Sequence, residues 1–530
     1  MIPWGGSLAG VYGCSFSSKT GKKLSLRRQP NILVIVTDDQ GYADLSVNGY
    51  MTDGQTPNMD RLAHSGFRFT NGYCTSPICS PARAGILTGL YQERWGNYYY
   101  GQGGLPQRYI TIPEYLRAAG YRTVKVGKSN FGVLENTPGT TDEEILADEE
   151  FPLNHGFEEF LGFCHCCHDY LRLSQAELDK LGAENAQDAF VGSLWRNRER
   201  EDFHENLTNV LTDETIRQIQ KKEDDRPFFI QLCYNAVHHP IYQAPDKYLK
   251  MFGLEKYPEW DPAKESWSSY HLREWWPVDR KSPELRKYYL ASLMCLDDDI
   301  GRLLDALEAE GLREDTLILF HSDNGGAQNT GARNTPLFGH KYMLGEGGIR
   351  VPYVISWPGQ IPAGKVCDDM VSALDIAPTC VAAAGMKQDE KQQFDGINLL
   401  PLLTGEVKRW PRRKHFWSNG WEWAVLDDDW KLRVTSEDTT VVRDTYPAKT
   451  YLYNIKKDPG EKENLAAKYP AKVLELQQVY KTWMQDIGQS QQYNSALPGF
   501  SAQVSNQVSS AQLGKKFNTD TIGGFCGCLD

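Results

Sequence analysis

The sequence predicts an α/β fold with a large mixed, mostly parallel sheet flanked by helices, followed by a smaller C-terminal α+β subdomain. Apolar, β-branched runs at 31–37, 227–234 and 316–320 have the pattern of strands that are buried on both faces. Helical periodicity, clearest over 288–310, alternates with these runs, and this alternation is typical of parallel sheets covered by helices. Near residue 405 the pattern changes to short strand-like pieces and one amphipathic helix.

These patterns divide the chain of 530 residues into four parts. Residues 1–29 form an N-terminal segment with some features of a degenerate export signal, and residues 30–404 form the main domain. Residues 405–489 form the α+β subdomain, and residues 490–530, rich in Gln, Ser and Gly, are expected to be a flexible tail. Within the subdomain we expect strands at 423–426, 431–434 and 451–455 and a helix at 471–484.

Charge and hydropathy argue against two classes of partner. The net charge of −12 gives no support for nucleic-acid binding, because a surface that follows phosphates usually carries a basic surplus. No apolar run reaches the ~18 residues that a membrane span needs. The 12 cysteines lack the spacing of a disulfide framework. Cys-His-Cys-Cys-His at 164–168 offers zinc-ligand side chains, but no second Cys/His pair follows at zinc-site spacing.

Charged and polar side chains follow four of the predicted strands. They are Asp38 and Asp39 after 31–37, Lys128 after 121–126, His238 after 227–234, and Asp323 with Asn324 after 316–320. Ligands bind beyond the carboxyl ends of the strands in such sheets, so we expect these side chains to converge. Two adjacent carboxylates at the end of a buried strand need a cation or strong donors to neutralise them. Their oxygen atoms favour a hard metal ion.

The stretch at 79–89, Cys-Ser-Pro-Ala-Arg-Ala-Gly-Ile-Leu-Thr-Gly, is expected to begin as a turn and to continue as a helix. Ser80 suits the N-cap, Pro81 the first helical position and Gly89 the end. Cys79 would then lie just before a helix N-terminus, where unpaired amides and the helix dipole favour an anion. Arg83, about one turn along, adds a positive charge near that sulfur.

Taken together, these residues resemble the formylglycine-dependent type I sulfatases, arylsulfatase-like members of the alkaline-phosphatase-like superfamily. The resemblance runs from Pro30 to about Ala466 and makes 30–404 the catalytic domain. Its motifs are Asp-Asp-Gln-Gly-Tyr at 38–42, the stretch 79–89, Gly-Lys at 127–128, His-His-Pro at 238–240, Ser-Asp-Asn-Gly at 322–325, Lys341, Glu-Gly-Gly-Ile-Arg-Val-Pro at 346–352, and Leu-Tyr-Asn-Ile at 452–455 with Asp-Pro at 458–459 and Glu-Asn-Leu at 463–465.

The resemblance implies a nucleophile made from Cys79. A maturation enzyme reads Cys-x-Pro-x-Arg, here Cys79, Pro81 and Arg83, and oxidises the cysteine to formylglycine (3-oxoalanine). One hydroxyl of the hydrated aldehyde attacks sulfur and displaces the alcohol, and loss of the proton from the other then expels sulfate. The ligands implied for Ca²⁺, or for Mg²⁺, are Asp38, Asp39, Asp323, Asn324 and the oxygens derived from Cys79.

The resemblance also assigns roles to the cationic side chains. Arg83, Lys128 and Lys341 would donate to the hydrate and the sulfate, and His238 would protonate the leaving oxygen, with Lys341 sharing that role. The implied substrate contacts are Lys128, His238, Lys341 and His168. One departure matters, because the family pattern Lys-x-His reads Lys128-Ser129-Asn130 here, and Asn130 cannot take a proton. We consider His168 or His165 as the base instead; His239 is a second choice for the acid, and His321 is as consistent with a structural role as with a catalytic one.

Two other functions stay open at this point. One is a phosphodiesterase or phosphonate monoester hydrolase of the same superfamily, and the other is an inactive homologue that binds sulfate esters. The expected substrate is a sulfated small molecule or glycan, and we favour a sulfated carbohydrate. Its recognition is expected from the tryptophan-rich insertion at 250–285 and from 164–197. We expect an exported protein, periplasmic, extracellular or lysosome-like.

Overall fold

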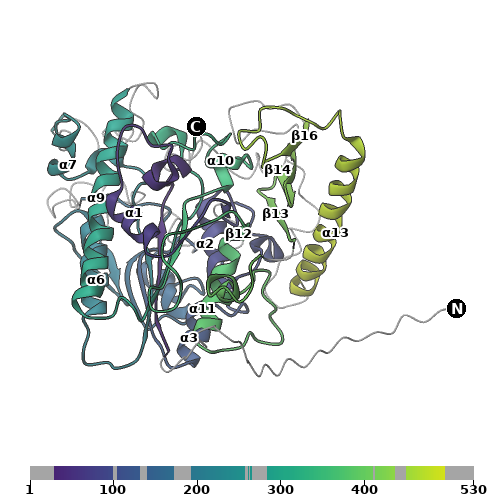
Figure 1. Ribbon diagram of the computed structural model, residues 1–530. Helices are drawn as coiled ribbons and strands as arrows, with labels where there is room; N and C mark the ends of the chain where they lie inside the picture. The colour runs from purple at the N-terminus through teal and green to yellow at the C-terminus, as the bar shows by residue number, and fades with distance from the viewer. Residues whose placement is uncertain are drawn as a thin grey trace.

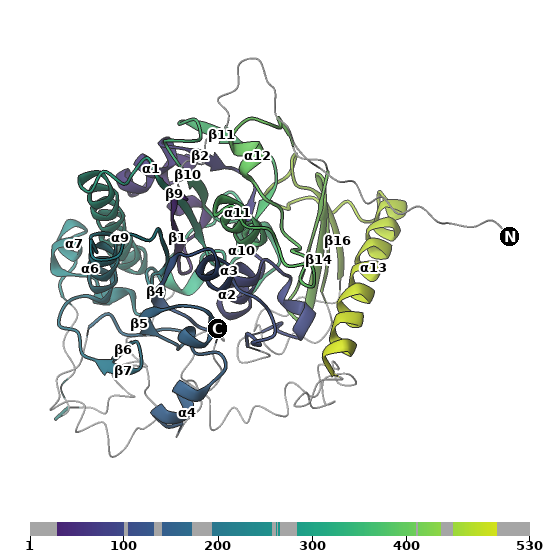
Figure 2. The same ribbon diagram turned by 90° about the horizontal axis from the view of Figure 1, so that it is seen from below.

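The computed structural model describes residues 29–99, 104–131, 140–171, 193–256, 261, 263–264, 283–409, 412–435 and 449–495. In these residues a large sheet lies between two layers of helices, and a smaller sheet with one long helix packs beside them (Figures 1 and 2). Residues 1–28, most of the insertion at 250–285 with its four tryptophans, and residues 496–530 lie outside this description. No helix in the described part is long and apolar enough to cross a membrane.

The large sheet has ten described strands in the order β11-β2-β10-β9-β1-β8-β4-β5-β6-β7. Their bounds, in chain order, are β1 Asn31–Thr37, β2 Phe67–Phe69, β4 Arg122–Lys128, β5 Glu159–Phe163, β6 Leu194–Arg196, β7 Glu199–Glu201, β8 Phe228–Cys233, β9 Thr316–Ser322, β10 Tyr353–Ser356 and β11 Lys365–Cys367. β9, β1, β8, β4 and β5 pair in parallel, whereas β10, β6 and β7 run antiparallel to their neighbours. A two-stranded sheet pairs β3 (Gly72–Tyr73) with β12 (Val371–Ser372).

β1 lies at the centre of the sheet because its two faces are both apolar. Leu33 and Ile35 point into a core shared with α1 (Pro57–His64), α6 (Leu207–Ile219) and α9 (Pro283–Ala309). Ile32 and Val34 point into a second core with α2 (Cys79–Thr88), α3 (Ile112–Ala118) and α11 (Ile376–Ala383). Because successive side chains of a strand point to opposite faces of the sheet, β1 contributes to both cores. Figure 2 shows the two sets of helices on opposite sides of the strands. The remaining helices are α4 Asp142–Ala147, α7 Asp246–Met251, α10 Glu346–Ile349 and α12 Leu400–Leu403.

The C-terminal subdomain is an antiparallel sheet of β13 (Lys414–Ser418), β14 (Glu422–Asp427), β15 (Trp430–Thr435) and β16 (Lys449–Asn454). One face is covered by α13 (Pro470–Ser495), where Leu476 joins Leu432 and Leu452 in a buried cluster. The other face carries Trp417 and Leu426 into a cluster with Tyr73 and Leu344 of the main domain. The subdomain is therefore fastened to the main domain by a hydrophobic contact, with α13 on the outside (Figure 1).

The predicted α/β class with a C-terminal sheet subdomain is confirmed. Two local expectations differ. Ser80 is not the N-cap of α2, because Ile78 is the extended residue that accepts from Ala82 N, so Cys79 is itself the first helical residue. The last helix continues to Ser495 rather than ending near 484. Gly89 does end α2, in the left-handed conformation expected there.

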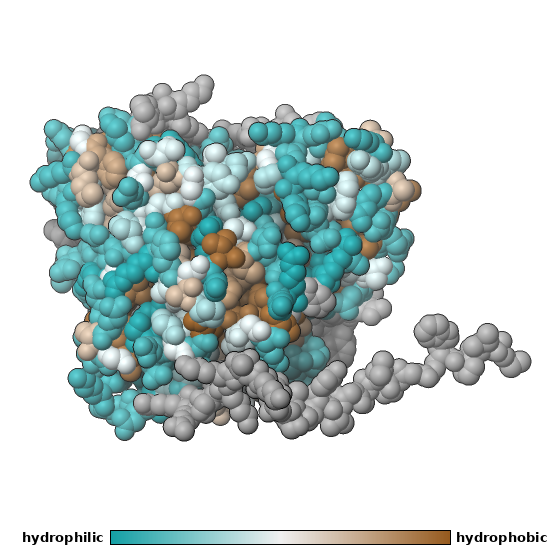
Figure 3. Space-filling model, viewed as in Figure 1, coloured by the Kyte–Doolittle hydropathy of each residue, from teal (hydrophilic) through white to brown (hydrophobic). Residues whose placement is uncertain are grey.

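The surface residues have the hydropathy expected of a globular protein. The face in Figure 3 is mostly hydrophilic, with hydrophobic residues in small separate patches rather than in one large area. Scattered apolar residues of this kind are ordinary for a globular protein.

Candidate active site

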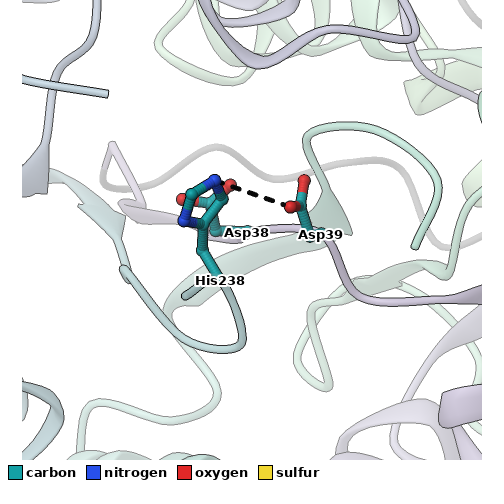
Figure 4. Close-up of side chains that lie close together, drawn as sticks. All are labelled: Asp38, Asp39 and His238. Atoms are coloured by element: carbon teal, nitrogen blue, oxygen red, sulfur yellow. Dashed lines mark ion pairs between the residues drawn. The ribbon is translucent and has the colours of Figure 1, made fainter. Parts of the chain in front are cut away.

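Three neighbouring strands bring the predicted metal ligands together. β1 pairs with β9 in a register that places Thr37 beside Ser322, and with β8 in a register that places Val36 beside Cys233. The residues that follow these strands, Asp38 and Asp39, Asp323 and Asn324, and His238, therefore emerge at one edge. All five are buried, with exposed fractions of 2% or less. Figure 4 shows Asp38, Asp39 and His238 side by side.

The backbone after β1 turns so that both aspartates are held in place. Asp39 has a φ of 58°, in the left-handed region that an aspartate tolerates better than most residues. Its amide donates to Asp323 Oδ1 at 3.2 Å, and Asn324 Nδ2 donates to its Oδ1 at 2.7 Å. Asp38 is fixed through its own backbone, because its amide donates to Ala236 O at 2.9 Å. The two carboxylates are thus positioned by the neighbouring strand ends.

Each carboxylate meets a cationic side chain. Lys128 Nζ lies 2.5 Å from Asp38 Oδ2, and Lys341 Nζ lies 2.9 Å from Asp39 Oδ2. Arg83, in the first turn of α2, donates to Asp323 Oδ2 from Nε at 3.0 Å and from Nη2 at 2.7 Å. Burial opposes the charge on Lys128, but Asp38, together with Cys79 and Asp323, raises the Lys128 pKa overall. Three fixed positive charges therefore line the site.

His238 completes the cluster from the loop after β8. Its Nε2 lies 3.7 Å from Asp39 Oδ2, the pair drawn as a dashed line in Figure 4. Burial and Lys341 disfavour a proton on this ring, whereas Asp38 and Asp39 favour one, and the pKa of His238 is raised overall. Tyr170 supports the loop by donating its hydroxyl to His238 O at 3.0 Å. The site therefore favours the protonated imidazole more than water does for a free histidine side chain.

Cys79 lies at the start of α2, beside the same groups. Burial raises the pKa of its thiol to about 11, although Lys128 and Lys341 act in the opposite direction. A thiol with that pKa is protonated at neutral pH and is a weak nucleophile. The unmodified side chain is thus poorly suited to attack an ester, although its position at the centre of the charges is suited to catalysis.

The oxygen atoms of the cluster fit a divalent cation. Asp38 Oδ1 and Asn324 Oδ1 are buried and have no hydrogen-bond partner in the described part of the protein. One ligand atom from each of Asp38, Asp39 and His238 lies within 4.8 Å of the others. Unpaired buried oxygens are costly, and a hard cation is the partner that carboxylate and amide oxygens prefer. Asp38, Asp39, Asp323 and Asn324 would hold it.

Asn130, at the position that departs from the family pattern, also faces inward. It has a φ of 52° and is fully buried, and neither Oδ1 nor Nδ2 has a hydrogen-bond partner among the described residues. An amide in this state can donate to, or accept from, a bound group. Asn130 therefore has two open hydrogen-bonding atoms but no means of taking a proton.

The histidines considered for that task lie in the segment after β5, where the His168 carbonyl accepts from Asn235 Nδ2 at 2.7 Å. The His168 ring lies 5.2 Å from the Phe163 ring and 5.7 Å from the Phe203 ring, and its Nδ1 is 2.8 Å from Asp169 O. His165 is buried in the same segment. Their part in proton transfer or substrate binding stays a prediction.

His321 stacks on Tyr353, and burial lowers its pKa to about 4, which suits a neutral structural residue. The cysteines and histidines of 164–168 form no metal-ligand group within the described residues.

Two features of the site were not predicted from the sequence. The Tyr342 ring lies 5.6 Å from Lys341 Nζ, and its only sequence signal is its place next to Lys341. Glu346, in the Gly-rich turn, accepts from Lys431 Nζ at 2.9 Å, and Lys431 also lies 3.2 Å from Glu461. All three side chains of that trio are fully buried. No local pattern marks it, because its members come from segments far apart in the sequence.

Acidic, cationic and amide side chains that gather at the carboxyl ends of parallel strands, beside a helix N-terminus, are the arrangement of a ligand site in an α/β protein, here one suited to a charged ligand. Residues 30–386 match the family described as Sulfatase, and residues 335–490 match N-sulphoglucosamine sulphohydrolase, C-terminal. The chain belongs to the sulfatase family and is a sulfuric ester hydrolase of the alkaline-phosphatase-like superfamily.

Relatives and a solved structure agree with this assignment. N-acetylgalactosamine-6-sulfatase of Mus musculus is 29% identical over 471 residues, with 82% of this chain and 81% of that one covered. Arylsulfatase A of Homo sapiens is 30% identical over 504 residues and covers 86% and 87%. The crystal structure of Ps i-CgsB in complex with k-i-k-neocarrahexaose is 30% identical with a TM-score of 0.70, covering 86% of this chain and 93% of that one.

Proposed function

We propose that this sulfatase hydrolyses a sulfate ester on a carbohydrate, using an oxygen nucleophile made from Cys79. The observation that carries the proposal is the position of Cys79, buried as the first residue of α2 beside Lys128, Lys341 and the two buried acids Asp38 and Asp323. Burial raises the pKa of its thiol to about 11, so the unmodified side chain is a weak nucleophile, and an oxygen nucleophile made from it suits this position better. Cys79, Pro81 and Arg83 form the Cys-x-Pro-x-Arg sequence that a formylglycine-generating maturation enzyme would read.

Oxidation of the Cys79 β-carbon by that enzyme and its oxidant, with loss of sulfur, would give the aldehyde. Its hydrate supplies an oxygen that attacks sulfur and a carbon that can release sulfate by re-forming the carbonyl. A bound Ca²⁺, or Mg²⁺, would supply positive charge against the sulfate oxygens. Asp38, Asp39, Asp323 and Asn324 would hold it, which gives partners to the unpaired Asp38 Oδ1 and Asn324 Oδ1.

The chain's own side chains provide the remaining chemistry. Arg83 holds Asp323 in place through two hydrogen bonds to one oxygen. Lys128 and Lys341 are buried donors that can pass from the aspartates to a bound sulfate. His238, whose raised pKa favours the protonated form, can give its proton to the leaving alcohol oxygen. Asn130 can hydrogen-bond to the hydrate or the sulfate, and it leaves the proton acceptor of the second half-reaction to another group.

The substrate class follows from the relatives. Two of them are named for, or solved with, a saccharide: N-acetylgalactosamine-6-sulfatase and Ps i-CgsB in complex with k-i-k-neocarrahexaose. We therefore propose a sulfated glycan as the substrate. The test panel consists of sulfated mono- and oligosaccharides prepared from carrageenan and from chondroitin sulfate. The proposal includes export, because sulfated polysaccharides are extracellular polymers.

The test combines mass spectrometry with turnover. Protein co-expressed with a formylglycine-generating enzyme should show an aldehyde and its hydrate in the peptide that spans Cys79, and should release sulfate from 4-nitrophenyl sulfate and from the panel. Cys79→Ala should abolish release while the protein stays folded. Full activity with an unmodified cysteine would refute the nucleophile. A faster reaction with phenyl phosphonate esters than with aryl sulfates would favour a phosphonate monoester hydrolase instead.

A further inference from the structure

A row of aromatic rings leads away from the site, and none of its members was predicted from the sequence to have a role. Lys341 Nζ, which lies 2.9 Å from Asp39, is 5.6 Å from the centre of the Tyr342 ring. The Tyr342 ring lies 6.4 Å from the Tyr99 ring, and the Tyr99 ring lies 5.3 Å from that of Trp421. The row thus begins at a charged group of the site and ends on the C-terminal subdomain.

The exposure of these rings separates them from the aromatic residues that hold the subdomain in place. Trp417 lies on the adjacent strand β13, is 1% exposed and packs against Tyr73 at the subdomain contact. Tyr99, Tyr342 and Trp421 are each partly exposed. Aromatic faces that stay open to solvent beside a site are suited to a ligand with apolar faces.

The row is also held in a fixed position. Tyr342 has a φ of 76°, its amide donates to Pro77 O at 2.9 Å, and its carbonyl accepts from Asn419 Nδ2 at 2.9 Å. Trp421 lies in the turn between β13 and β14, where Glu422 Oε2 accepts from Leu344 N at 2.7 Å. The turn is therefore tied on both sides of Trp421 to the segment that carries Lys341 and Tyr342. A platform fixed in this way loses little conformational freedom when a ligand binds.

We propose that Tyr342, Tyr99 and Trp421 form a platform for consecutive sugar rings of a sulfated oligosaccharide, starting beside the ring that carries the reacting sulfate. The inference rests on the proposed function and names the length of its substrate. Pyranose rings have C–H faces that pack on aromatic rings and hydroxyl edges that stay in water. A single sugar or aryl ring at Lys341 would contact only Tyr342, whereas the row continues through two further rings onto another subdomain. This geometry favours an oligomer over a monosaccharide.

The test compares substrate length across variants of one hairpin. The matured enzyme is assayed on the best sulfated hexasaccharide of the panel and on the corresponding sulfated monosaccharide. Trp421→Ala should raise KM for the hexasaccharide about tenfold, so that the hexasaccharide-to-monosaccharide ratio of kcat/KM falls about tenfold. Trp421→Phe should keep most of the ratio. The matched control is Trp423→Ala, because Trp423 stacks on Tyr480 of α13 at 4.0 Å and should leave the ratio unchanged.

The outcomes separate this inference from the proposed reaction. If sulfate is released and Trp421→Ala leaves the ratio unchanged, the platform is wrong while the sulfatase proposal stands. If no saccharide is hydrolysed, binding of the hexasaccharide is measured by calorimetry with the full chain carrying Cys79→Ser. A loss of affinity of about tenfold on adding Trp421→Ala supports the platform without turnover. Equal affinity, or no binding by either protein, overturns it.

Discussion

Replacement of Lys431 by methionine should destabilise the protein far more than an ordinary lysine substitution. Lys431 Nζ lies 2.9 Å from Glu346 Oε1 and 3.2 Å from Glu461 Oε1, and all three side chains are fully buried. Lys431→Met leaves two buried carboxylates without their shared cation. Glu346 keeps the Tyr73 hydroxyl at 2.9 Å, and Glu461 keeps the Glu346 amide at 2.9 Å, so the loss is partial. We expect the substitution to lower the free energy of unfolding by about 3–5 kcal/mol.

Urea unfolding followed by fluorescence measures this loss. Lys457→Met, at an exposed position of the same subdomain, is the control and should change the free energy of unfolding by less than about 0.5 kcal/mol. Burial raises the Glu461 pKa even with Lys431 present, so Glu461 is the carboxylate least supported without it. Lys431→Met with Glu461→Gln should therefore be more stable than Lys431→Met alone.

The difference in the free energy of unfolding between the wild type and the Lys431→Met variant should also become smaller at acid pH. Lys431 lowers the pKa of both glutamates, so without it each folded-state pKa is higher than in the wild type, and the folded variant binds protons at a pH where the folded wild type does not. The stability lost on substitution is therefore largest where both glutamates are ionised and becomes smaller as they take up protons at acid pH. A cost below about 1 kcal/mol, or additive effects of the two substitutions, would refute the assignment of this trio as an ionic unit.

Three further predictions concern the site and one buried acid. Exhaustive chelation with EDTA should lower both turnover and the thermal midpoint, and Ca²⁺ or Mg²⁺ should restore both; unchanged turnover would refute a cation at Asp38 and Asp39. His238→Gln should lower kcat/KM by about 10²–10⁴-fold on alkyl or sugar sulfates but much less on 4-nitrophenyl sulfate, whose leaving group needs little protonation. Burial raises the pKa of Glu93 to about 8, so the folded state retains a proton that the unfolded state loses above 4.5, and stability falls as pH rises through this window. Glu93→Gln should therefore stabilise the protein more at pH 8 than at pH 5, and equal effects in urea unfolding would contradict this pKa.

The central sheet could be predicted from the sequence because its strands have a strong local pattern. The runs that became β1, β8 and β9 are apolar at nearly every position, a pattern that few other elements share. Once these strands were placed in parallel, Asp38, His238 and Asp323 had to emerge at the same edge. The convergence of the candidate site could thus be predicted from strand ends alone.

The other features of the site and its surroundings depend on tertiary contacts, which produce no local pattern in the sequence. Asp39 adopts a positive φ because Asp323 and Asn324 hold its amide and carboxylate, and those residues lie almost 300 positions away. The approach of Trp421 to the active-site edge depends on how the subdomain docks. The prediction of Ser80 as N-cap was wrong for a related reason, since the extended residue before α2 is Ile78, two residues earlier than propensity suggests. Tertiary contacts override local preference in these places.

The burial of Cys79 has a consequence for the order of events in the life of the chain. In the folded protein its side chain is 2% exposed beneath Lys128 and Lys341, so no second protein can reach it. The strands that enclose it include β9, which ends at Ser322, more than 240 positions downstream. Synthesis therefore provides an interval in which Cys79 has emerged but the sheet cannot yet close. The maturation proposed for Cys79 would have to fall in that interval, and a chain that folded first would keep its thiol.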